Sequence, residues 1–300
     1  GEFDGRDWNI VPLKKSYENK FLYFRFFSDD AYIGVAEYSM IGSEADLIIW
    51  MLKKDITLLS LTAVYMFVGL ITCFFWYTNR VEKSYLAFGG FAFSIGIYGF
   101  CRTSVKTFVF DDPTFWGYVE LGSLYLTPVY ICKFCDYLFS KSKYNYLNFA
   151  AWLIGGYSAI AFVATIFTDR TLWDFLYVWQ YLVLATAPVL VGYMGFIAAK
   201  GDREARLLFV GIFVVVISTI LDILSTIGVV TGVGVVIHLG VFALTCCLGQ
   251  IVAGRLFQTV TIKKNLELAS SVQELLLPKK REGTFCQFDF STKYDQYGKM

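Results

Sequence analysis

Residues 234–254 read GVVIHLGVFALTCCLGQIVAG, a stretch of 21 residues without a lysine, arginine, aspartate or glutamate. A helix needs about 20 apolar residues to cross the hydrocarbon core of a bilayer. Six further apolar runs precede this one, with short connections between them. They cover residues 56–78, 84–101, 118–139, 146–167, 172–199 and 205–230. The sequence therefore predicts an all-α polytopic membrane protein built on a seven-helix transmembrane bundle in the lipid bilayer.

The composition agrees with a membrane protein and argues against other classes. Of the 300 residues, 56% are hydrophobic and 19% are aromatic, which exceeds the share in ordinary soluble domains. The net charge of +1 gives no reason to expect binding to nucleic acid. Cys132 and Cys135 have the spacing of redox or zinc sites, but they lie in an apolar run without a nearby histidine, so we interpret them as packing residues.

Basic residues are distributed unequally between the two sides of the predicted bundle. One side carries Arg80, Lys83, Lys141, Lys143, Lys200, Arg203, Arg206, Arg255, Lys263 and Lys264. The other side carries only Lys53, Lys54, Arg102, Lys106 and Arg170. Cytoplasmic loops are enriched in lysine and arginine. We therefore expect the N-terminus outside the cell and the C-terminus in the cytoplasm.

The segment before the first span, residues 1–49, predicts a short extracellular β segment. Residues 20–28 are rich in aromatic side chains, and residues 31–38 form a second short strand pattern after the turn signal of Asp29 and Asp30. Two strands do not fold alone. We interpret residues 1–49 as the C-terminal part of a β-rich sensor domain, with residues 46–54 as an amphipathic connector into the bundle of residues 50–254.

A cytoplasmic signalling helix is predicted over residues 255–278, where residues 267–278 read ELASSVQELLLP. Its heptad-compatible positions are Ile262, Leu266, Ala269, Gln273 and Leu276, and Pro278 ends the helix. We assign signal transmission to this seam, and a parallel coiled coil would make the protein a homodimer. Residues 279–300 are interpreted as the start of an output domain, with alternation over residues 284–291 that is typical of a strand.

Ionisable residues inside predicted spans provide the candidate sensing residues. Asp222 lies near the outer end of the sixth span, and His238 lies at a similar depth in the seventh. Because these spans are antiparallel neighbours, the two side chains could form a ligand- or proton-sensing pair or a structural hydrogen bond between helices. Arg102 and Glu120, at the outer ends of the second and third spans, could form an extracellular ion pair.

Two further patterns predict contacts within the bundle. Gly90, Ser94, Ala92 and Gly96 form small-residue pairs in the second span, which favour a packing surface against neighbouring helices. Lys133 and Asp136 are three residues apart, a spacing that favours a local pair.

The succession of residues 21–28, Tyr32–Gly34, seven spans and a signalling helix resembles bacterial seven-transmembrane receptors with diverse intracellular signalling modules (7TMR-DISM). The resemblance implies a multi-pass receptor of the bacterial inner membrane. It also implies an extracellular small-molecule ligand of carbohydrate type.

The tail carries a second resemblance. Residues 268–273 and Leu275–Pro278 are similar to the first helix of SpoIIE-type, PPM-family serine/threonine phosphatases, and residues 285–294 to their first strand. This implies Mg or Mn as the metal of the output domain and a phosphoprotein as its substrate. Asp289 and Asp295 do not match the expected Gly-Gly-Asp motif, so no catalytic residue and no metal site are assigned. A nucleotide cyclase output, or a seven-span binding or transport protein without enzymatic output, remains the alternative.

Overall fold

The computed structural model describes residues 40–79, 82–110, 112–139, 146–168, 170–226, 236–276, 282–285 and 288–291. Residues 1–39, with the predicted β segment, lie outside this range. The chain divides into two units, residues 1–248 and residues 249–300. Each unit is described by itself.

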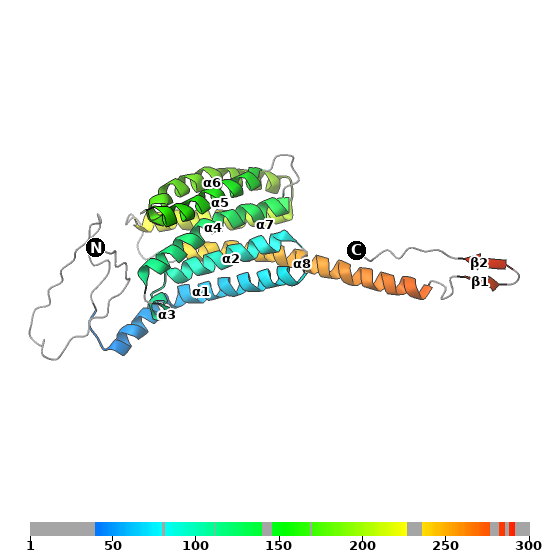
Figure 1. Cartoon of the computed structure of the whole chain (residues 1–300), viewed down its shortest axis with the longest axis horizontal. Coiled ribbons are helices and arrows are strands. Elements are labelled where there is room, and N and C mark those ends of the chain that lie inside the picture. The colour runs from blue at the N-terminus through cyan, green and yellow to red at the C-terminus, as the bar shows by residue number, and fades with distance from the viewer. Residues whose placement is uncertain are drawn as a thin grey trace, which may run out of the picture. The chain divides into compact units, whose positions relative to one another are not determined.

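The described elements of the first unit are helices. They are α1 (Glu44–Asn79), α2 (Lys83–Cys101), the short α3 (Lys106–Val109), α4 (Pro113–Phe139), α5 (Tyr146–Phe167), the 3₁₀ helix η2 (Leu172–Phe175), α6 (Leu176–Ala199), α7 (Arg203–Thr226) and the first part of α8 (Val236–Leu276). Figure 1 shows them lying side by side, with α1 packed on α2, α2 on α4, α4 on α5 and α6 on α7.

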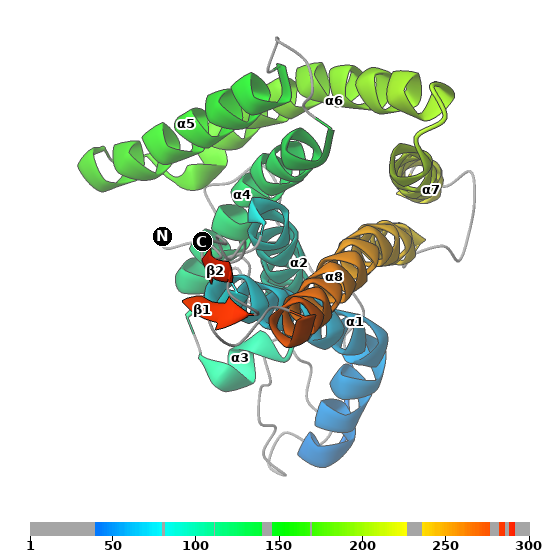
Figure 2. The same ribbon diagram turned by 90° about the vertical axis from the view of Figure 1, so that its right-hand side faces the viewer.

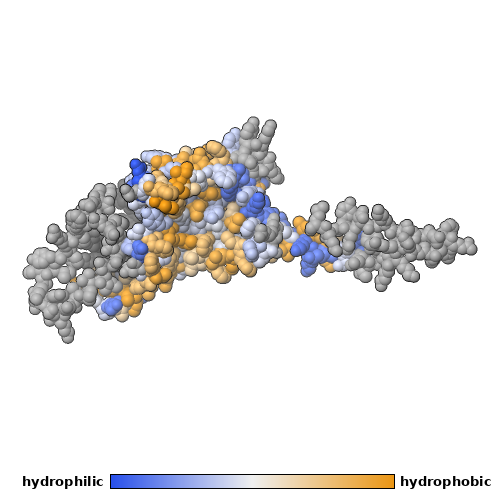
Figure 3. All heavy atoms as spheres, in the orientation of Figure 1, coloured by the Kyte–Doolittle hydropathy of each residue, from blue (hydrophilic) through white to orange (hydrophobic). Residues whose placement is uncertain are grey.

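The described parts of the predicted apolar runs fall on these helices, and residues 172–199 cover both η2 and α6. By length and composition, five helical segments in the described part of the chain are able to cross a membrane: Glu44–Thr78, Lys83–Cys101, Tyr146–Phe167, Leu172–Ala199 and His238–Gln273. The protein is thus a polytopic helical membrane protein. Helices α4 and α7 are not among the five, and a total of seven spans stays a prediction. On the face seen in Figure 3, hydrophobic residues cover the middle of the helices.

Helix α1 runs through the predicted amphipathic connector and into the first predicted span. The helix begins at Glu44, inside the segment assigned to the β-rich domain, and continues through residues 46–54 to Asn79. Ser43 caps its first turn, since the Ser43 hydroxyl accepts a hydrogen bond from the backbone N–H of Asp46 at 3.2 Å. The sequence from Glu44 to Ile56 contains no glycine or proline that would interrupt the helix.

Glycines allow α1, α2 and α4 to approach closely. A Cβ atom placed on Gly69 of α1 would lie 2.6 Å from the backbone nitrogen of Phe93 in α2. A Cβ on Gly96 would meet Met66 of α1 at 2.5 Å, and one on Gly90 would meet the Tyr130 ring of α4 at 2.6 Å. The prediction that the small residues of the second span form a packing surface within the bundle is confirmed.

Helices α4, α5 and α6 meet around a cluster of buried residues centred on Tyr125. This side chain is fully buried, and its ring stacks on that of Trp179 in α6 with 5.1 Å between centroids. Its hydroxyl donates to the carbonyl of Leu172, at 3.0 Å, just before α6. Leu121 and Ile154 complete the contact. The cluster holds the start of α6 against α4 and α5.

The beginning of α8 fills the space between α7 and α1 (Figure 2). A Cβ on Gly240 would lie 2.4 Å from the hydroxyl of Ser218 in α7, and a Cβ on Gly211 of α7 would lie 3.0 Å from the side chain of Leu244. On the other side, the rings of Tyr65 in α1 and Phe242 in α8 are 6.4 Å apart. Small residues thus bring α8 into the bundle.

The second unit holds the rest of α8 and a hairpin of two short strands, β1 (Glu282–Phe285) and β2 (Phe288–Ser291). The strands are antiparallel, with Glu282 opposite Ser291. A single strand over residues 284–291 was therefore the wrong prediction, because a period of two does not reveal where a strand is interrupted. Residues of the last predicted span and of the predicted signalling helix belong to one helix of 41 residues.

Candidate ligand-binding site

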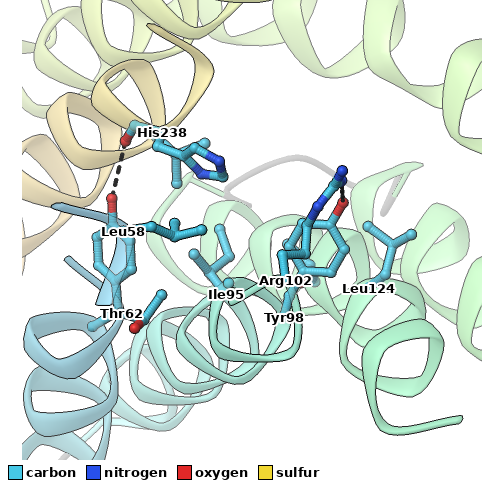
Figure 4. A pocket seen from close by; sticks show the side chains of 11 residues that line it. Leu58, Thr62, Ile95, Tyr98, Arg102, Leu124 and His238 are labelled. Carbon is cyan, nitrogen blue, oxygen red and sulfur yellow. Dashed lines mark hydrogen bonds between the residues drawn. The ribbon is translucent and has the colours of Figure 1, made fainter. Parts of the chain in front are cut away.

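A cavity of about 390 Å³ lies among four helices of the first unit. Its lining comes from Leu58, Thr62 and Tyr65 of α1, Ile95, Tyr98 and Gly99 of α2, Arg102 directly after α2, Leu124 and Thr127 of α4, and His238 and Val241 of α8. Figure 4 shows seven of these residues by name. The cavity lies at the C-terminal end of α2 and the beginning of α8. This is the predicted outer end of the bundle.

Arg102 is the cationic residue of the cavity lining. It caps the C-terminus of α2, and its backbone N–H bonds the carbonyls of Gly99 and Phe100. Its guanidinium donates to the hydroxyl of Tyr98 at 2.8 Å and lies over the Tyr98 ring, 5.7 Å from the centroid. Because Tyr98 is one helical turn before Arg102, the two side chains share one face of the helix end. The tyrosine thus orients the guanidinium.

His238 enters the cavity from α8. Its imidazole points between the helices (Figure 4), and its backbone carbonyl accepts a hydrogen bond of 3.1 Å from the hydroxyl of Tyr65 in α1. Tyr65 is only 2% exposed, and this hydrogen bond is partly buried. It holds the first turn of α8 against α1 and thereby sets the position of the imidazole.

The turn that follows α2 is attached to α1 by a buried carboxylate. Asp55 accepts a hydrogen bond from the backbone N–H of Ser104 at 2.6 Å. The ammonium of Lys106, also buried, donates to the carbonyl of Cys101 at 2.6 Å, where α2 ends. A cation at a helix C-terminus is favourable because it complements the helix dipole. These contacts fix the backbone on which Arg102 stands.

The structure groups the predicted sensing residues differently from the sequence analysis. His238 and Arg102, predicted as members of two separate pairs, line the same cavity. Asp222 belongs to α7, but its side chain lies outside the described residues, and so its pairing with His238 stays a prediction. Glu120 is half-buried on α4 and is not part of the cavity lining, and its ion pair with Arg102 likewise stays a prediction.

Sequence reasoning missed the two tyrosines that position these groups. Tyr98 had a usable signal, because it precedes Arg102 by four residues in a helix. Tyr65 had none, since one aromatic residue in an apolar run looks like any other. Lys133 was assigned a local partner, yet it donates to Asn148 and lies 5.0 Å from the Trp152 ring centroid, both on α5. A lysine side chain is long enough to reach a neighbouring helix, and its position three residues before Asp136 does not prevent this.

Four of the predicted signalling residues fall on α8. Leu266, Ala269 and Gln273 are exposed there, and Leu276 is the last residue of the helix. Pro278 lies outside the described residues. In the part of the chain that the structure describes, no group of three or more His, Cys, Asp or Glu residues is arranged to hold a metal ion.

Chemically, the cavity combines apolar walls with a few polar groups. Leu58, Ile95, Leu124 and Val241 supply the walls. The polar groups are the Arg102 guanidinium, the His238 imidazole, the Tyr65 and Tyr98 hydroxyls, and the hydroxyls of Thr62 and Thr127. A concave, mostly apolar space with a small number of placed polar groups is typical of a small-molecule site.

Comparison with known families gives one match. The profile of the family described as 7TM diverse intracellular signalling matches residues 54–254, which is two thirds of the chain and contains every residue that lines the cavity. No curated protein and no solved structure matches the chain.

Proposed function

The chain belongs to the 7TM diverse intracellular signalling family, and we propose that it is a bacterial receptor in which a ligand in the Arg102–His238 cavity controls a cytoplasmic SpoIIE-type phosphatase. The family itself makes the chain a transmembrane signalling receptor. The ligand site, the output and the topology, with the N-terminus outside and the C-terminus in the cytoplasm, are our proposal.

One observation carries the proposal: α8 contributes to the cavity and also contains the signalling segment. His238 and Val241 line the cavity, and Leu266, Ala269 and Gln273 belong to the same helix. A ligand shifts a conformational equilibrium only when it binds the two states with different affinity. A ligand that contacts His238 meets this condition if α8 takes a different rotation or tilt in each state.

The phosphatase is proposed from the tail. Residues 268–273 and 275–278 resemble the start of a SpoIIE-type domain, and the hairpin of β1 and β2 follows them. That domain would use Mg or Mn to activate water against a phosphoserine or phosphothreonine. We further propose that the heptad seam of Ile262, Leu266, Ala269, Gln273 and Leu276 pairs with a second copy, since Leu266 is 65% exposed in this chain.

Insertions into α8 test the coupling in the protein that carries the output domain. One or two residues inserted after Leu266 rotate the following helix by about 100° or 200°, whereas seven residues add about two full turns and restore the phase. We expect the short insertions to change Mn-dependent hydrolysis of a phosphoserine peptide at least several-fold, and the seven-residue insertion to restore it.

The matched control places the same insertions after Gly201, in the connection between α6 and α7. This glycine has a φ of 96°, and a Cβ there would meet nothing within 4 Å. These insertions should leave activity unchanged. Equal activity at every insertion length in α8 would exclude coupling through helix phase, and cyclic nucleotide formation without phosphatase activity would assign the output to a cyclase.

A further inference from the structure

The resemblance to the receptor family suggested a carbohydrate ligand, but the cavity in the bundle has a different chemistry. We propose that it binds a small organic carboxylate with a short aliphatic or aromatic tail, held by Arg102 and His238. This assignment rests on the proposed ligand role of the cavity and names the class of ligand.

The shape of a cation in the lining points to a carboxylate. Arg102 supplies a guanidinium to the described lining of the cavity. The guanidinium has a planar set of N–H donors that matches the two oxygens of a carboxylate. Its hydrogen bond and stacking contact with Tyr98 hold it in place before a ligand arrives. Less conformational entropy is then lost on binding.

His238 provides a second donor from another helix. Its imidazole can donate a hydrogen bond to an oxygen of the same ligand. Because Arg102 follows α2 and His238 is in α8, a ligand that contacts both would connect these two helices. Such a ligand would bind with different affinity to two arrangements of these helices, as the proposed receptor function requires.

The walls argue for an apolar tail and against a sugar. Leu58 and Ile95 project into the space between Arg102 and His238 (Figure 4), and Leu124 and Val241 also line it. Sugar hydroxyls buried against these side chains would be left without hydrogen-bond partners, at a cost of about 1–3 kcal/mol each. A short hydrocarbon tail makes no such demand. The volume of about 390 Å³ lies in the range of small-ligand sites.

Binding can be measured on residues 1–300 in nanodiscs of phosphatidylcholine, with empty nanodiscs to subtract partitioning into lipid. The probes are hexanoate and phenylacetate, their neutral amides hexanamide and phenylacetamide, and glucose. We expect each carboxylate to bind at least about 10-fold more tightly than its amide, because a hydrogen bond to a charged group is the stronger one. Equal or tighter binding of the amides or glucose, or no binding of either carboxylate, would overturn the assignment.

Variants identify the residues responsible. Arg102→Gln should lower hexanoate affinity about 10-fold or more and remove the preference over hexanamide, while Arg102→Lys should keep part of that preference. His238→Gln should lower the affinity less. Arg170→Gln, which changes an exposed arginine outside the cavity, should bind like the wild type. Melting temperatures without ligand separate lost binding from lost folding, and Arg102→Lys provides the test if Arg102→Gln does not fold.

Anionic lipid headgroups share the oxyanion chemistry of a carboxylate, and one further measurement distinguishes a lipid headgroup from a small carboxylate as the ligand. Addition of phosphatidylglycerol to the nanodiscs should leave hexanoate affinity unchanged; competition would make a headgroup the occupant and overturn the small-carboxylate assignment. The insertion experiment at Leu266 is independent of all these measurements. Carboxylate binding with no phase-dependent output would therefore reject the proposed function alone, and phase-dependent output with no carboxylate binding would reject the ligand class alone.

Discussion

Helices α2 and α6 are both long and apolar enough to cross a membrane, but they are buried to very different extents. In the most apolar stretch of α2, 61% of the residues are buried, compared with 6% in α6, although α6 is the more hydrophobic of the two. Lipid tails are as apolar as leucine, so hydrophobicity does not drive helices together inside a bilayer. Small residues and placed polar contacts decide which helix is packed.

The largest expected change in stability concerns the contact that anchors α6. Trp179 is 6% exposed and stacks on Tyr125, whereas Tyr181, on the same helix, is 70% exposed. We expect Trp179→Ala to lower the free energy of unfolding by roughly 3 kcal/mol through lost packing. Tyr181→Ala should change it little. Thermal unfolding of the two purified variants measures the difference, and equal melting temperatures would show that α6 is not anchored at Trp179.

A second test makes the same substitution in the packed and the exposed region. Gly69 leaves no room for a methyl group beside the backbone of Phe93, while a Cβ on Gly192 of α6 would meet nothing within 4 Å. Gly69→Ala should cost about 1–3 kcal/mol through overpacking. Gly192→Ala should be neutral or stabilise the helix slightly. Chemical denaturation in detergent provides both values, and an unchanged Gly69→Ala variant would argue against the close contact of α1 and α2.

The smallest expected change in stability concerns two carboxylates, one buried and one exposed, that each accept a hydrogen bond from a backbone N–H. Asp55 is buried and bonds Ser104, and Asp174 is exposed and bonds the N–H of Thr171 before α6 at 2.8 Å. We expect Asp55→Ala to cost about 1–2 kcal/mol, because it leaves a buried donor without its partner.

Asp174→Ala should cost less than this, since water replaces an exposed hydrogen bond. Asp55→Ala should also weaken hexanoate binding, because the Ser104 turn supports Arg102. A larger loss of stability in Asp174→Ala than in Asp55→Ala would contradict the expectation that the buried hydrogen bond near α2 contributes more than the exposed one before α6.

Much of the helical architecture could be predicted from the sequence. Long apolar runs predict helices because a backbone in lipid must satisfy its own hydrogen bonds. The small residues of α2 predicted a packing surface, and Gly90 and Gly96 contact Tyr130 and Met66 as such a surface requires. The ends of helices were less predictable. The sequence does not distinguish a connector over residues 46–54 from the first turns of α1, because helix-forming residues occur in both.

The candidate site was predicted only in its parts. Intramembrane ionisable residues are costly, which is why His238 was recognised as a candidate. Arg102 was recognised separately, as a member of an ion pair at the outer ends of two spans. Their proximity was not predicted, and Tyr65 and Tyr98 were not recognised at all. Helix periodicity places a residue on one face of its own helix, but the angle at which that face meets a neighbour depends on packing across the whole bundle.

The sequence alone identifies a polytopic helical membrane protein and predicts a signalling helix, because hydropathy and heptad spacing are properties of contiguous residues. Only the tertiary structure placed His238 and Arg102 around one cavity and joined the last span to the signalling segment as the single helix α8. The physical reason is that the glycines and buried hydrogen bonds of different helices jointly set their rotation. No single segment contains that information.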